Sequence, residues 1–327
     1  MTLLLLANSH KILNSNTQKH THIKMKVSSS NQMMKAVALP DKTSCKVVEI
    51  PKPIPNNGEA LIKVEYSSLD TAFHEVAHRT MIPGSLLHNL KVNPLVIGWH
   101  FSGTIESVAD GTVADLKKGD KVFGHLQYSR STDFDVAAAV AIESLTALQG
   151  LRDQGGLCEG KSVLIIAAAG GVGSQAVQIA KALKAGAIHG VCSTKDVDTV
   201  KELGADLVVD RTAQDILKDL KNSYDVIFDT TGKYAYSKLK YALKKNGTMV
   251  STIPNITTML PFNHSKAVMV QCNKSDLDIV GDWLMSGDIS SIKIDSTYSI
   301  KDIQEAWERQ DGDKRSGRVV IKVEGGW

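Results

Sequence analysis

The sequence has few cysteines and no long apolar run. Its four cysteines, Cys45, Cys158, Cys192 and Cys272, are scattered, without the close pairs of a zinc site or the density of a secreted disulfide framework. We therefore expect free thiols in a reducing compartment. No apolar stretch approaches the roughly 20 residues that a transmembrane helix needs, so we predict no membrane span.

The charge of the chain also excludes a class of partner. The 327 residues carry 38 Lys and Arg against 35 Asp and Glu, a formal net charge of +3. No Lys/Arg block interleaved with aromatic residues occurs, so nucleic acid is not a predicted partner. The length and a 43% hydrophobic content are typical of a globular protein with two domains, whose partners we expect to be small molecules.

Acidic residues are missing from the first 33 residues, where four lysines lie among serines, asparagines and histidines. This composition is typical of a plastid or mitochondrial transit peptide. Two alternatives stay open: a disordered tail on a cytoplasmic protein, or a start codon assigned too early, with Met33 or Met34 as the true beginning.

Residues 161–206 are the most informative segment, because they predict a strand, a glycine turn, a helix and a second strand. An apolar run at 162–168 has strand length, and 174–183 repeat apolar residues at helical spacing. The turn contains Gly170, Gly171, Val172 and Gly173. Glycine lets the backbone approach a pyrophosphate at a helix N-terminus. A plain tight turn would also contain glycines, but the surrounding pattern favours a dinucleotide site.

The end of the second strand, 188–192, bears on the choice of cofactor. An NAD-type site presents an Asp or Glu there to the ribose hydroxyls, whereas this chain has Ser193, Thr194 and Lys195. Two hydroxyls and an ammonium suit a 2′-phosphate, so the sequence favours NADP(H) over NAD(H). Ser193 can also cap a helix that begins near Asp196, with Lys195 as a surface charge.

The remaining pattern predicts an α/β fold, a Rossmann doubly wound parallel sheet after a β-rich domain. Strands are expected at 36–39, 46–50, 60–66, 95–97, 103–108, 120–123, 224–229, 248–252, 292–294 and 318–323. Helices are expected at 137–151, 237–243, 277–285 and 303–309, with a turn at Asn246 and Gly247 and a helix stop near Gly287.

Several segments, taken in order, resemble the medium-chain dehydrogenase/reductase superfamily and its zinc-independent quinone oxidoreductase and enone reductase branch. They cover nearly everything after Lys35: GDKVFG at 119–124, AAAV and LTALQGL within 137–151, AAAGGVGSQAVQIAK at 167–181, CSTKDVDTVKELGAD at 192–206, YDVIFDTTG at 224–232 and SGRVVI at 316–321.

The resemblance implies a GroES-like substrate domain at 34–136, a Rossmann NADP(H) domain at 137–290 and a C-terminal segment, 291–327, that returns to the first domain. It implies hydride transfer from NADPH to a small quinone or α,β-unsaturated carbonyl, and a possible homodimer. It also implies no metal, since Asp70 and Trp99 stand where zinc-dependent relatives have Cys and His. The nearby histidines, His74, His78, His88 and His100, are more typical of surface or core positions than of ligands.

Position within the family adds further cofactor contacts. Thr146 is expected on the nicotinamide side of the cofactor; the alternative is a threonine bonded to its own helix backbone. Arg318 matches a basic position before the last strand; the alternative is an exposed surface charge. Thr252 is expected beside the nicotinamide because it ends a strand facing the cleft. Tyr66 and Tyr128 are candidate proton donors or packing residues, and no catalytic residue is assigned.

Two departures from the family affect the enzymatic interpretation. Asp70 replaces the usual Asn of enone reductases, so that position can only accept hydrogen bonds, and it can serve as a helix cap. The segment 125–136 is too short for the strand that relatives insert there, and its loss is expected to expose a sheet edge. An NADP(H)-binding protein without turnover, a redox sensor or interaction partner, is therefore the alternative function.

Overall fold

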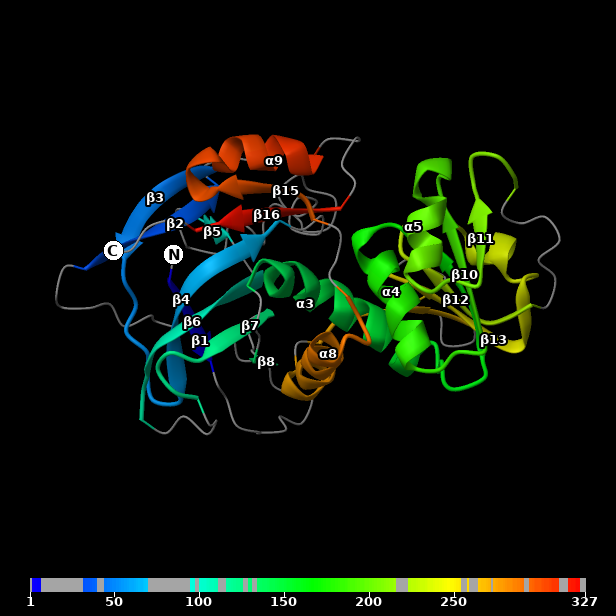
Figure 1. The fold of residues 1–327 in the computed structure, drawn as a ribbon, viewed down its shortest axis with the longest axis horizontal. Coiled ribbons are helices and arrows are strands. Elements are labelled where there is room, and N and C mark those ends of the chain that lie inside the picture. Colours follow the sequence, from blue (N-terminus) through cyan, green and yellow to red (C-terminus); the bar gives the residue numbers. More distant parts are fainter. Residues whose placement is uncertain are drawn as a thin grey trace. The chain divides into compact units, whose positions relative to one another are not determined.

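The computed structural model forms two compact units, one from Met1–Ala139 with Ile294–Trp327 and one from Val140–Lys293 (Figure 1). It describes residues 2–6, 32–39, 44–69, 95–97, 100–110, 116–125, 129–130, 134–215, 223–253, 258, 264–271, 273–290, 294–311 and 317–323. Several residues considered above lie outside these ranges: Asp70, His74, His78, His88, Trp99, Tyr128 and Cys272.

The first unit is built mainly from antiparallel strands. Its larger sheet has the order β15-β16-β4-β6-β7-β8, with β1 also paired to β4. These strands are β1 (Thr2–Leu6), β4 (Glu59–Ser68), β6 (His100–Val108), β7 (Lys121–His125), β8 (Ser129–Arg130), β15 (Ile294–Ser299) and β16 (Arg318–Lys322). A smaller sheet joins β3 (Lys46–Pro51), β2 (Met33–Leu39) and β5 (Leu95–Ile97).

Apolar side chains from both ends of the sequence fill the core of the first unit. Ile62 on β4, Phe101 on β6 and Ile321 on β16 are buried in one cluster with Trp307 of helix α9 (Ile303–Asp311). Residue Val320 pairs with Ser68 across the two antiparallel strands. The C-terminal strand is thus an integral part of this sheet.

The segment 125–136, expected to be too short for the strand that relatives insert, contributes a short strand to the larger sheet. Within 125–136, Ser129 and Arg130 form the two-residue strand β8 and lie opposite Phe123 and Val122. Another part of the chain adds to the sheet elsewhere: Thr2–Leu6, inside the segment expected to be a transit peptide or a disordered tail, pairs antiparallel with β4. A disordered tail was one interpretation of this region. For residues 2–6 that interpretation was wrong, because they form a strand paired with β4.

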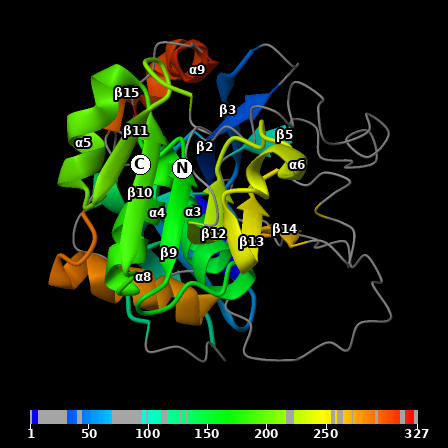
Figure 2. The same ribbon diagram turned by 90° about the vertical axis from the view of Figure 1, so that its right-hand side faces the viewer.

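The second unit contains a six-stranded parallel sheet, which confirms the predicted fold class. Its order, β11-β10-β9-β12-β13-β14, is that of a Rossmann fold and reverses direction between β9 and β12. Figure 2 shows the strands in this order from left to right. They are β9 (Ser162–Ile166), β10 (Ala187–Cys192), β11 (Leu207–Asp210), β12 (Tyr224–Asp229), β13 (Leu243–Ser251) and β14 (Ser265–Ala267).

Helices precede, connect and follow these strands. They are α3 (Phe134–Leu148), which continues as a π-helical turn at Gln149–Gln154, α4 (Gly171–Ala182), α5 (Val197–Glu202), α6 (Tyr236–Leu239) and α8 (Lys274–Ser286). As predicted, α8 stops at Gly287, whose positive φ of 80° suits glycine. Among the helices that the structure describes, none is both long enough and apolar enough to cross a membrane.

The prediction of a helix at 237–243 followed by a turn was wrong. Helix α6 ends at Leu239, and strand β13 already begins at Leu243, so Asn246 and Gly247 lie within a strand. The pairing of β12 with β13 is irregular between Tyr224 and Val226. A Cβ on Gly247 would lie 2.8 Å from the Tyr224 carbonyl oxygen. Leu243 pairs with Tyr224 and the next pair is Thr248 with Val226, so residues 244–247 form an irregularity within the strand instead of a helix end.

Candidate dinucleotide site

The loop after β9 turns the chain sharply from strand to helix. Ala167 has a positive φ of 59°, which is uncommon for a residue with a side chain and is often found at functional loops. The Ala168 N–H donates to the Val191 carbonyl oxygen over 2.9 Å, and the Gly170 N–H donates to the Ala167 oxygen over 2.9 Å. Helix α4 then begins at Gly171.

Close contact between α4 and this loop requires glycine at position 173. A Cβ there would lie 2.1 Å from the Ala167 carbonyl oxygen and 2.9 Å from the Ala168 Cα. The amides of Gly171, Val172 and Gly173 are the first of the helix and have no acceptor within it. The predicted residues Gly170 to Gly173 therefore lie together as a backbone cradle that a phosphate group fits.

Hydroxyl groups gather where β10 and β11 end. The Ser193 Oγ donates to the Asp196 carboxylate over 2.7 Å, while the Thr194 and Thr212 hydroxyl oxygens lie 2.5 Å apart. The Thr212 hydroxyl donates to the Asp210 carboxylate over 2.6 Å. Ser193 also precedes a short 3₁₀ turn at Thr194–Asp196, and Lys195 is exposed. Ser193 takes the N-cap position of this turn, but its side chain makes no capping hydrogen bond, and the N-cap residue of the following helix is Asp196, so the capping interpretation of Ser193 was wrong.

Two groups beside these hydroxyls have shifted pKa values. Hydrogen bonds from Thr212 and Thr194 lower the pKa of Asp210, so this carboxylate is ionised at neutral pH. Burial raises the pKa of the Cys192 thiol to about 11, with a smaller contribution from Asp196. Cys192 therefore adds no negative charge near pH 7.

A buried carboxylate organises the loop after β12, next to the point where the strand order reverses. Asp229 is fully buried. Its Oδ1 accepts from the Thr231 N–H at 2.9 Å, the Thr231 Oγ1 at 2.7 Å and the Gly232 N–H at 3.2 Å, and its Oδ2 accepts from the Tyr234 N–H at 3.2 Å. This network rigidifies the loop after β12.

Two threonines join the ends of β9, β12 and β13. The Thr230 hydroxyl donates to the Ile166 oxygen at 2.8 Å, and the Thr252 hydroxyl donates to the Thr230 oxygen at 3.1 Å. Asp229 and Thr230 were not among the predicted site residues. The sequence does indicate them, because an Asp followed by threonines directly after a buried strand is typical of a turn held by side-chain hydrogen bonds.

Thr146 and Arg318 are both engaged within their own units. The Thr146 hydroxyl donates to the Ile142 oxygen of its own helix at 2.7 Å, as the alternative interpretation proposed. Arg318 is only 7% exposed on β16, and its Nη1 donates to the Leu69 oxygen at 2.5 Å. The interpretation of Arg318 as an exposed surface charge was therefore wrong.

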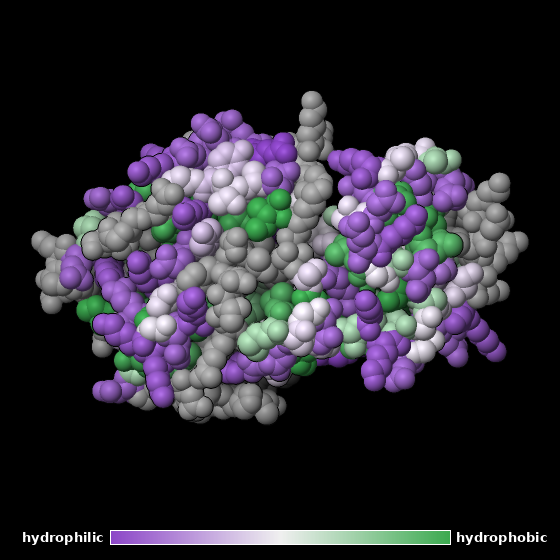
Figure 3. All heavy atoms as spheres, in the orientation of Figure 1, coloured by the Kyte–Doolittle hydropathy of each residue, from purple (hydrophilic) through white to green (hydrophobic). Residues whose placement is uncertain are grey.

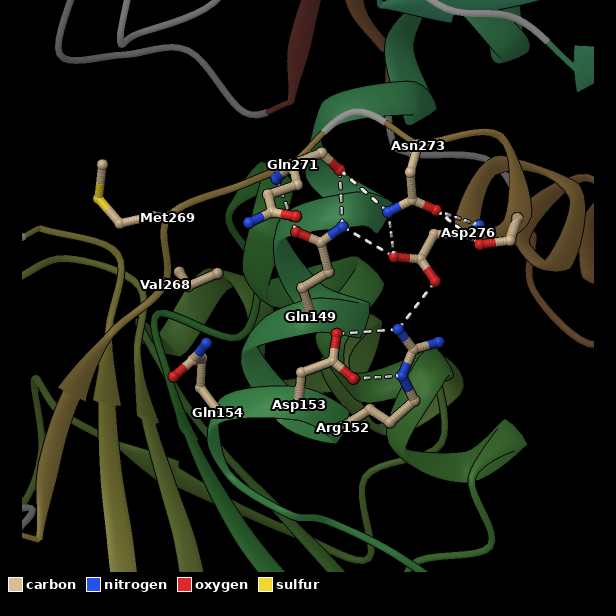
Figure 4. A pocket seen from close by; sticks show the side chains of 10 residues that line it. Gln149, Arg152, Asp153, Gln154, Val268, Met269, Gln271, Asn273 and Asp276 are labelled. Atoms are coloured by element: carbon tan, nitrogen blue, oxygen red, sulfur yellow. Dashed lines mark hydrogen bonds and ion pairs between the residues drawn. The ribbon is translucent and has the colours of Figure 1, made fainter. Parts of the chain in front are cut away.

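A separate pocket of 360 Å³ lies against the π-helical turn of the second unit (Figure 4). Gln149 Nε2 donates to one Asp276 oxygen at 2.8 Å, and Arg152 Nη2 donates to the other at 2.8 Å. Burial alone would raise the pKa of Asp276. Hydrogen bonds from Asn273, Gln149 and Arg152 have a larger, opposite effect, so the pKa lies below its ordinary value. These side chains bond one another, as expected of a structural lock between the turn and α8.

Within the part of the chain that the structure describes, no three His, Cys, Asp or Glu side chains lie together as a metal site. His100 is buried at the start of β6. Hydrophilic side chains predominate among the described residues on the face in Figure 3.

Two family models match the chain. The alcohol dehydrogenase GroES-like domain matches residues 56–174 and the zinc-binding dehydrogenase matches residues 171–288, together more than two thirds of the length. The chain belongs to the medium-chain dehydrogenase/reductase superfamily. This confirms the resemblance deduced from the sequence.

Individual members of the superfamily are similar over most of the chain. The chloroplast envelope quinone oxidoreductase homolog of Arabidopsis thaliana is 25% identical over 84% of this chain and 93% of its own length. The NADPH-dependent alkenal/one oxidoreductase, chloroplastic, of the same organism is 27% identical over 70% of this chain and 64% of its own length. The quinone oxidoreductase structure from Coxiella burnetii has a TM-score of 0.79 and 25% identity, and the match covers 90% of this chain and 100% of that one.

Proposed function

We propose that the protein is an NADPH-dependent oxidoreductase that transfers a hydride to a quinone or an α,β-unsaturated carbonyl without zinc. The observation that carries the proposal is the glycine cradle between β9 and α4, beside the point where the strand order reverses. Similarity to proteins named quinone oxidoreductase and alkenal/one oxidoreductase supports the choice of substrate class.

In this proposal the cofactor is held by backbone amides and by the strand ends. The amides of Gly171 to Gly173 hold the pyrophosphate, and glycine at position 173 lets the start of α4 approach the β9 loop closely enough to form the cradle. Ser193, Thr194 and Lys195 lie toward the 2′-phosphate, and Thr252 lies toward the nicotinamide. The nicotinamide supplies the hydride when bound, and the protein orients the acceptor.

The residues at two positions support a reaction without zinc. By the resemblance to the family, Asp70 and Trp99 stand where zinc-dependent members have Cys and His, and an indole is not a zinc ligand. The proton that completes the reduction then comes from solvent or from a tyrosine. Of the two tyrosines proposed as proton donors, Tyr66 lies in the part of the chain that the structure describes, on β4.

The alternative function is NADP(H) binding without turnover. It is favoured by the short segment 125–136, whose described part includes the two-residue strand β8. Plastid targeting of residues 1–33 and a homodimer also stay predictions. The chloroplast names belong to the relatives.

Turnover separates the two functions. Mixing the full chain with NADPH and either a simple enone or a benzoquinone should lower the absorbance at 340 nm, because hydride leaves the cofactor, while a saturated ketone should give little change. Binding of NADPH without consumption across a broad panel of quinones and enones would favour the alternative and contradict the proposed reductase.

A further inference from the structure

Arg211 lies beside the predicted 2′-phosphate residues although it follows a different strand. It comes directly after β11, and its N–H donates to the carbonyl oxygen of Cys192, the last residue of β10, over 2.9 Å. The contact between Thr194 and Thr212 hydroxyls joins the same two loops. The Arg211 side chain is exposed, and its positive charge opposes the rise in the Cys192 pKa, as expected of a nearby cation.

The local charges show why Lys195 alone is a poor phosphate contact. Two carboxylates lie at these strand ends: Asp196 accepts from Ser193 and Asp210 accepts from Thr212. With Lys195 as the single cation, a phosphate carrying about 1.5 to 2 negative charges would meet a net negative surface. Arg211 brings the cations to two and balances the two carboxylates.

Neither cation is engaged elsewhere in the described part of the chain. The ion pairs among the described residues include neither Lys195 nor Arg211. A guanidinium is suited to the task because its planar N–H groups can bind two phosphate oxygens at once, whereas an ammonium acts as a point charge.

We propose that Arg211 is the second cationic contact of the 2′-phosphate and the residue that determines preference for NADP(H) over NAD(H). The inference rests on the proposed function only in requiring that a nicotinamide dinucleotide bind at the β9–α4 loop. NAD(H) lacks the 2′-phosphate and gains nothing from this contact. Arg211 was not among the residues predicted from the sequence.

Calorimetric binding of 2′,5′-ADP and 5′-AMP to the full chain tests the assignment without any turnover. Arg211→Gln should weaken 2′,5′-ADP about 10- to 100-fold, the range for a lost charge-assisted hydrogen bond or bidentate pair. Affinity for 5′-AMP should change less than about twofold, because this ligand has no 2′-phosphate. Arg211→Lys should retain part of the affinity.

Lys201→Gln is the matched control, since Lys201 is an exposed cation in the last turn of α5 and should leave both ligands unaffected. If Arg211→Gln binds 2′,5′-ADP as tightly as the wild-type chain, the role of Arg211 is wrong while the proposed function stands. If the folded wild-type chain binds neither 2′,5′-ADP nor NADPH, the proposed function fails as well.

Discussion

A Gly173→Ala variant should bind NADPH about 10- to several hundredfold more weakly than the wild-type chain, the cost of one or two lost hydrogen bonds to a charged group. The new Cβ would sit 2.1 Å from the Ala167 carbonyl oxygen. Because the obstructing atoms are backbone, α4 itself has to move away from the β9 loop. The amides at its N-terminus then no longer converge on the pyrophosphate.

Calorimetric titration with NADPH measures this loss, and circular dichroism with urea unfolding establishes that the variant is folded. Gly170→Ala is the graded control, because its Cβ would lie 3.2 Å from the same oxygen and requires a shift of only a few tenths of an ångström. A folded Gly173→Ala chain with wild-type affinity for NADPH would show that contact between α4 and the loop does not form the cradle.

Replacing Asp229 by alanine should lower the free energy of unfolding by about 3 kcal/mol, since a buried carboxylate is removed and its donors lose their partner. Four hydrogen bonds reach this carboxylate, three of them at Oδ1. The loop after β12 would lose its internal support, and with it the Thr230 contact to the end of β9.

Urea unfolding of the full chain provides the measurement. Asp229→Asn should fall between wild type and Asp229→Ala, because its amide oxygen can still accept at the Oδ1 position while its NH₂ faces the Tyr234 N–H. Alanine at Asp282, an exposed carboxylate on α8, should change stability by less than about 0.5 kcal/mol. Equal stabilities of Asp229→Ala and wild type would rule out Asp229 as the organiser of the loop after β12.

Much of the second unit could be predicted because its signals are local. The strand at 224–229 was predicted with the bounds of β12, and the strand at 188–192 differs from β10 by one residue. Continuous apolar runs bounded by turns are typical of buried parallel strands. The glycines at 170–173 predicted the start of α4 for the same reason, since their turn and the helix after it are adjacent in sequence.

Features that depend on distant partners could not be predicted in this way. The segment 243–247 was expected to be a helix end and a turn, yet it lies within β13, with Leu243 paired to Tyr224 and the regular pairing resuming at Thr248. The position of Arg211 beside β10 follows from strand order, and the acceptor of Arg318 lies on a distant segment. No periodicity within one segment specifies such contacts.

The pairing of the N-terminal strand β1 also depends on a distant partner and could not be predicted from the sequence. The sequence indicated that a strand is missing at 125–136, but it could not indicate that Thr2–Leu6 would pair with β4. Pairing between segments so far apart depends on which backbone edge remains open after the rest of the sheet has formed.

Calorimetric titration of NADPH and of NADH into the full chain tests the central claim most directly. Backbone amides at the start of α4 and the cations at the ends of β10 and β11 should make NADPH bind at least about tenfold more tightly than NADH. No heat with either cofactor on folded protein, or tighter binding of NADH, would contradict the account.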